Sequence, residues 1–137
     1  MKKKYQYFDH TADLGIEIFG DSVITLFANT AYAIFETQII GDIKSKQNKL
    51  VELKAETLDD LLIDWCRELL YLFSVHHFIP GEYSIAIKNH QLTARIKGEL
   101  FDKNRHKIRI EIKNVTYHNF KIDVHGNKYK ATIVFDV

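Results

Sequence analysis

Cysteine and proline are almost missing from this 137-residue chain, which contains one of each, Cys66 and Pro80. A single cysteine cannot form an internal disulfide, and this agrees with a reducing compartment. No apolar run approaches the roughly 18 residues that a membrane-spanning helix needs, and the basic start of the chain is not followed by an apolar signal segment. We therefore expect a cytoplasmic protein that has no membrane partner.

An excess of charge of either sign is missing as well. Lys and Arg number 19 against 18 for Asp and Glu, so the formal net charge is +1. Proteins that hold nucleic acid through its phosphates usually carry a clear basic excess, and this balance therefore argues against strong, autonomous RNA binding. The composition, 46% hydrophobic and 27% charged, is that of a globular protein. The length suits one compact domain over residues 1–137.

Two segments have the apolar periodicity of helices. The first runs roughly from Ser22 to Thr37, with Asp21 or Ser22 as the N-cap. The second follows Thr57, which can form a capping box with Asp60, and it carries leucines and aromatic residues on one face and charged residues on the other.

Most of the remaining chain alternates apolar and polar residues, which predicts strands. The alternating runs cover residues 14–18, 51–53, 83–87, 92–96, 108–112, 120–124 and 129–135. Hairpin-like breaks occur at Asn89-His90 and Gly126-Asn127. Because clean alternation indicates one buried and one solvated face, we predict an α+β two-layer sandwich: a largely antiparallel sheet with the two main helices packed on one face.

The end of the sequence stops inside an apolar strand pattern, where Asp136 is followed only by Val137. The side chain of Asp136 and the α-carboxylate of Val137 would then lie close together, and two such groups repel unless a proton or a cation intervenes. Oxygen-rich anionic sites select hard cations. From spacing alone, however, a strand that simply ends in solvent is the favoured interpretation.

A second polar group lies near the start, in the run Asp9-His10-Thr11-Ala12-Asp13-Leu14-Gly15. Two acids and a histidine are concentrated here, and Gly15 would permit an unusual backbone turn. The structural alternative is that the acids cap backbone amides while the histidine is part of a polar cluster. No phosphate-binding loop, dinucleotide fingerprint or nucleophile elbow occurs in the chain.

Five segments, in this order, resemble those of the archease family and together span essentially the whole chain. They are Asp9 to Gly15, the helical run Leu62 to Leu72, Gly98 to Asp102 with Arg105-His106, Val115 to His118, and the final Asp136-Val137.

The resemblance implies a small metal-binding protein that assists the GTP-dependent 3′-phosphate RNA ligase of tRNA splicing and RNA repair. It implies that a divalent ion (Ca²⁺, Mg²⁺ or Mn²⁺) is held by Asp13, Asp136 and the α-carboxylate of Val137. Further family-motif positions are candidates for contacts with the partner or for supporting the metal ligands: Asp9, His10, Glu99, Asp102, His106 and His118.

From this resemblance we expect an activator that promotes guanylylation of the ligase and multiple turnover, with no catalytic residues of its own and only indirect contact with RNA. Two alternatives stay open: a stand-alone metal-dependent hydrolase or nuclease, and an RNA-binding, chaperone-like module. The basic residues from Arg105 to Lys113 would share one side of a strand. That side could be a solvated surface or could face RNA or an acidic surface of the ligase.

Overall fold

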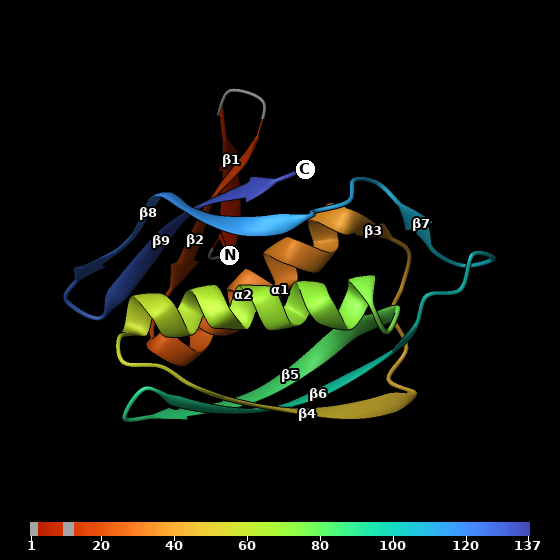
Figure 1. The fold of residues 1–137 in the computed structure, drawn as a ribbon, viewed down its shortest axis with the longest axis horizontal. Coiled ribbons are helices and arrows are strands. Elements are labelled where there is room, and N and C mark those ends of the chain that lie inside the picture. Colours follow the sequence, from red (N-terminus) through yellow and green to blue (C-terminus); the bar gives the residue numbers. More distant parts are fainter. Residues whose placement is uncertain (1–2, 10–12) are drawn as a thin grey trace.

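The computed structural model of the chain describes residues 3–9 and 13–137. Two long helices occur among the first strands of the chain, and this layer of helices lies between two groups of strands (Figure 1). The elements are β1 (Tyr5–Phe8), β2 (Leu14–Gly20), α1 (Val23–Gln38), β3 (Ile39–Ile40), β4 (Gln47–Lys54), α2 (Leu58–Ser74), β5 (Phe78–Lys88), β6 (Gln91–Leu100), β7 (Lys107–Ile108), β8 (Asn114–His125) and β9 (Lys128–Asp136).

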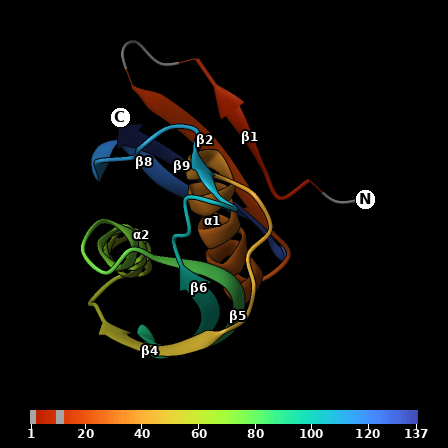
Figure 2. The same cartoon turned by 90° about the vertical axis from the view of Figure 1, so that its right-hand side faces the viewer.

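The strands form a four-stranded sheet in the order β1-β2-β9-β8, a three-stranded sheet in the order β4-β6-β5, and the short pair β3-β7. Every pairing is antiparallel. The predicted α+β class, with two helices packed against antiparallel strands, is confirmed. The strands divide between two larger sheets, and both helices contact both of them (Figure 2). The reason is that α1 buries residues around much of its circumference, so one sheet could not cover it.

Both helices begin where the sequence indicates. The Ser22 hydroxyl accepts a hydrogen bond from the amide of Thr25 (3.1 Å), and the Thr57 hydroxyl accepts one from the amide of Asp60 (3.1 Å). Such caps satisfy amides that have no partner inside the helix. Between the helices, the buried indole of Trp65 donates to the carbonyl of Phe27 (2.9 Å). Within the described residues, no helix is long and apolar enough to cross a membrane.

The two predicted hairpin breaks are confirmed. Asn89 and His90 connect β5 to β6 with φ values of 52° and 58°, and Gly126 begins the β8–β9 turn with φ 63°. Turns with positive φ match the twist of the strands that they join. The long strands therefore fold back on their immediate sequence neighbours.

The strand predicted over residues 108–112 is wrong for most of its length. Only Lys107–Ile108 pairs, with β3, and the chain beyond it is irregular. Its amides bond instead to the end of α1: Arg109 donates to the main-chain oxygen of Gln38 (2.7 Å), and Ile112 donates to the Gln38 side-chain oxygen (3.0 Å). The alternating pattern is present, but beyond Ile108 none of the described strands pairs with it.

Glycine is required in β6 where that strand passes the irregular part of β5. The register of the pair shifts between Pro80 and Glu82, and Gly98 is opposite Pro80. A Cβ atom at position 98 would overlap the main-chain oxygen of Ile79. A side chain here could be accommodated only if the two strands separated.

We therefore expect Gly98→Ala to lower the free energy of unfolding by about 2 kcal/mol, because backbone must move to relieve the overlap. Urea denaturation followed by circular dichroism measures the change. Lys97→Ala, an exposed change on the same strand, is the control and should stay within about 0.5 kcal/mol of the wild type. Equal stability of the two variants would contradict the packing described for β5 and β6.

Candidate functional site

The pairing of β2 with β9 brings together residues from the two ends of the sequence. In this pair Leu14 is opposite Phe135. Asp13 immediately precedes Leu14 and Asp136 immediately follows Phe135, so the two aspartates lie at the same end of the pair. Val137 follows directly. We call these three residues the carboxylate end.

Alternation along β9 decides which way Asp136 faces. Ile133 and Phe135 are fully buried against the helices, so Asp136 faces away from them, and it is exposed. On the neighbouring strand the exposed Asn114 pairs with Asp136, and the amide of Lys113 donates to the main-chain oxygen of Asp136 (2.8 Å). Asn114 was not among the predicted site residues. Only the β8–β9 pairing brings it here, and the hairpin signal at Gly126-Asn127 does not indicate the register shift between Thr116 and Lys121 that sets this contact.

Gly15 has a different role from the one predicted. It lies within β2, and its φ is not positive. Among the described glycines, those with positive φ are Gly41 and Gly126. Phe8 pairs with Gly15 across the β1–β2 ladder, and a Cβ atom at position 15 would lie 2.5 Å from the Phe8 ring. The glycine therefore allows an aromatic ring to cover the sheet next to the carboxylate end, and it is not needed for a turn.

The atoms at the carboxylate end that could bind a metal ion are carboxylate oxygens. Among the residues that the structure describes, no group of three or more His, Cys, Asp or Glu side chains is placed to hold a metal. The set implied by the family resemblance is of another kind, because it combines only two side chains, Asp13 and Asp136, with a main-chain carboxylate. Such a set would suit a hard cation.

A separate polar cluster surrounds Glu99, which is only 2% exposed. One carboxylate oxygen of Glu99 accepts from the guanidinium of Arg105, and the other accepts from the amide of Lys44 (2.7 Å) and lies 3.2 Å from Nε2 of His106. Burial alone would raise the pKa of Glu99, but the hydrogen bonds from Arg105 and Lys44 and the nearby positive charge lower it to about 2. Glu99 is therefore an ionised, buried group.

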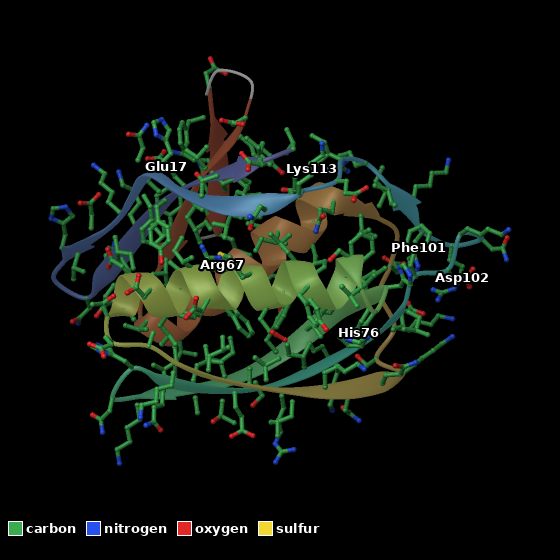
Figure 3. The ribbon with its side chains drawn as sticks, in the orientation of Figure 1. Glu17, Arg67, His76, Phe101, Asp102 and Lys113 are labelled. Carbon is green, nitrogen blue, oxygen red and sulfur yellow. The ribbon has the colours of Figure 1, made fainter. Side chains whose placement is uncertain are left out.

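The imidazole of His106 connects two loops in this cluster. Its Nδ1 accepts from the amide of Asp102 (2.9 Å), so Nε2 carries the proton, and Nε2 lies 3.0 Å from the carbonyl oxygen of Asp42. Three of the predicted contact residues, Glu99, Asp102 and His106, thus gather around the C-terminal end of β6. In Figure 3, Asp102 lies at the right-hand end of the molecule, away from the C-terminus marked in Figure 1. Contacts of Glu99 and His106 connect β6 and the loop that follows it to the segment around Asp42 and Lys44.

The remaining predicted contact residues lie elsewhere. Asp9 is exposed just after β1. His118 is exposed in the irregular part of β8, where the register shifts between Thr116 and Lys121. His10 lies outside the described residues. The structure therefore separates the predicted residues that it describes into the carboxylate end, the cluster around Glu99, Asp9 just after β1, and His118 on β8.

These features define a small α+β protein in which two helices lie between antiparallel sheets and acidic residues from both ends of the sequence lie at the same end of one strand pair. The sequence matches the family described as Archease protein family (MTH1598/TM1083) over residues 5–137. It is 33% identical to protein archease of Sulfurisphaera tokodaii, over 98% of this chain and 99% of that protein. It is 35% identical to protein archease of Methanosarcina barkeri, over 98% and 97%. The chain belongs to the archease family.

Solved structures have the same fold. The solution structure of protein 1598 from Methanobacterium thermoautotrophicum superposes with a TM-score of 0.83 at 29% identity, over 98% of this chain and 99% of that one. A crystal structure from Thermotoga maritima, described as an archease and possible chaperone, gives a TM-score of 0.62 at 26% identity, over 100% and 98%.

The buried cluster predicts a pH-dependent contribution to stability. The pKa of Glu99 falls from an ordinary 4.5 to about 2, so its contribution is complete above about pH 4.5 and is lost as the pH falls towards 2. Glu99→Gln should lower the free energy of unfolding by about 2 kcal/mol at pH 7, because Arg105 and His106 lose a charged partner.

Urea denaturation at pH 7 and at pH 3 measures this effect, with the exposed Glu52→Gln as the control. The difference between the wild type and Glu99→Gln should be smaller at pH 3 than at pH 7, while the control follows the wild type at both. A difference that is unchanged or larger at pH 3 would mean that Glu99 is not held in its ionised form.

Proposed function

We propose that this archease-family protein binds a divalent metal ion at the carboxylate end and activates the GTP-dependent 3′-phosphate RNA ligase of tRNA splicing and RNA repair. In this role it promotes guanylylation of the ligase and multiple turnover. The observation that carries the proposal is the β2–β9 register, in which Leu14 is opposite Phe135 and Asp13 and Asp136 share one end of the sheet.

The proposed ligands are the side chains of Asp13 and Asp136 and the α-carboxylate of Val137. Three carboxylates gathered at one place repel one another, and a bound cation offsets this repulsion. All the donors are oxygen, as Ca²⁺, Mg²⁺ and Mn²⁺ prefer. When bound, the ion supplies a concentrated positive charge at the surface.

The exposure of the site supports action on a partner. Asp136 is exposed, and Val137 is 39% exposed at the end of a sheet. An enzyme usually encloses its substrate in a cleft, where water is excluded and charges act more strongly. A projecting sheet end is better suited to insertion beside the reacting groups of another macromolecule. We therefore propose an activator, without catalytic residues of its own, over a stand-alone hydrolase.

The charge of the chain supports indirect contact with RNA. A net charge of +1 gives little general attraction for phosphates. In this proposal the ligase holds the RNA, and the archease chain, one domain over residues 1–137, meets the ligase in the cytoplasm. The chaperone-like alternative would require binding of RNA or of unfolded chains without a ligase.

Metal binding is tested by calorimetric titration with Ca²⁺ and Mn²⁺. Asp13→Asn and Asp136→Asn should each weaken binding about tenfold or more, because each removes a charged ligand. One glycine added after Val137 should do the same, because it moves the α-carboxylate. The matched control is Asp123→Asn, since Asp123 pairs with Lys130 towards the opposite end of the same sheet. Wild-type affinity in all three altered proteins would eliminate the site.

Activation is tested by an RNA ligation time course with limiting ligase. The wild-type protein and Asp123→Asn should raise the number of ligations per ligase molecule by about tenfold, whereas Asp136→Asn should give less than about a tenth of that gain. Parallel reactions without ligase examine RNA cleavage and RNA binding. No acceleration by the wild type, combined with cleavage or binding of RNA alone, would overturn the proposal in favour of one of its alternatives.

A further inference from the structure

The segment 107–113 precedes β8 and exposes apolar side chains. Its alternation of apolar and polar residues would instead predict that these side chains are buried. Residues 107–111 are all exposed. Ile108 is 48% and Ile110 37% exposed. A single exposed isoleucine is ordinary, but two within three residues of one short segment form a local apolar patch.

This patch is held in a fixed position by its backbone. Gln38 accepts hydrogen bonds from the amides of Arg109 and Ile112, and the guanidinium of Arg109 donates to the main-chain oxygen of Glu36 (3.3 Å). Ile112 is buried and fastens the segment to the core. Ile108 and Ile110 are therefore presented to solvent by an anchored segment, and a partner would lose little conformational entropy in ordering it.

The far end of the segment reaches the carboxylate end directly. The amide of Lys113 donates to the main-chain oxygen of Asp136 (2.8 Å). Figure 3 shows Lys113 where the chain enters β8, close to the C-terminus marked in Figure 1. A macromolecule that contacts the carboxylate end is thus in reach of the segment as well.

The charges around the isoleucines indicate what would bind there. The segment carries three exposed basic residues, Lys107, Arg109 and Lys113, and one acidic residue, Glu111. A complementary surface is acidic around an apolar centre. RNA would satisfy the cations but leave the isoleucines unused, because single-stranded RNA stacks on aromatic side chains and residues 107–113 contain none. An acidic protein surface satisfies both features.

We propose that residues 107–113 form a docking surface for an acidic, apolar-centred face of the RNA ligase. This inference rests on the proposed function and extends it, because the surface would hold the ligase while the adjoining carboxylate end reaches its reacting groups.

The test compares two double variants in which exposed apolar residues become serine. I108S/I110S removes the centre of the patch, and I24S/L50S removes two exposed apolar side chains from α1 and β4, outside the proposed surface. Calorimetry measures the affinity for the ligase and, separately, for Ca²⁺; fluorescence anisotropy measures the affinity for a labelled RNA. I108S/I110S should bind the ligase at least tenfold more weakly than the wild type. The ligase affinity of I24S/L50S, and the Ca²⁺ affinity of each variant, should stay within twofold of the wild type.

Lys107→Glu should also weaken ligase binding, because the new carboxylate repels the acidic face. The loss of affinity should be larger at low salt than at high salt, because salt screens this repulsion. Ligase binding by I108S/I110S within twofold of the wild type, or equal weakening in I24S/L50S, would overturn the docking surface while leaving the proposed function intact. A change in RNA affinity alone would overturn it in favour of an RNA surface. Failure of the wild type both to bind and to accelerate the ligase would instead overturn the proposed function, and the docking surface with it.

Discussion

The pairing of β2 with β9 is the constraint on which the rest of the structure depends. It joins the start and the end of the sequence at the centre of the four-stranded sheet, with β1 and β8 on either side. Its inner face supplies Ile16, Ile18, Ile133 and Phe135, all fully buried against the helices. A shift of register by one residue would move each of these to the outer face of the sheet and drive Asp136 inwards. The hydrophobic core therefore sets the position of the carboxylate end.

Two kinds of carboxylate can be distinguished in the described part of the chain: one that is buried and paired, and one that is exposed at a sheet end. Glu99 is buried, with its oxygens occupied by Arg105, Lys44 and His106, and its lowered pKa reflects these contacts. Asp136 lies on the outer side of the sheet and is exposed. Acidic residues alone do not indicate which role each has; the direction of the strand and the neighbouring donors do.

The sequence predicted the elements better than their arrangement. Local signals located the helices, because Ser22 and Thr57 are N-caps that act within three residues. They also located both hairpin turns. They could not indicate that the strands divide between two sheets, since this depends on how many faces of α1 are buried. They also predicted a strand over residues 108–112, where the pattern is present but Gln38 takes the hydrogen bonds.

For the candidate site, the family resemblance named residues far apart in sequence, and the strand register supplies a physical reason to consider Asp13 and Asp136 together. The gathering of Glu99, Asp102 and His106 had no such signal. Their contacts run through main-chain groups of Lys44 and Asp42, which no side-chain pattern reveals. Gly15 illustrates the same limit, because its requirement comes from the ring of Phe8 across the ladder.

The central claim, a divalent site at the carboxylate end, is tested most directly by titrating the ¹⁵N-labelled protein with substoichiometric Mn²⁺ and recording which amide signals broaden. The ion's unpaired electrons broaden signals from nearby nuclei only. The account predicts that Asp13, Asn114, Asp136 and Val137 broaden first, while Gly126 at the opposite end of the sheet is unaffected. Broadening centred on the loop around Asp102, or spread evenly over the surface, would contradict it.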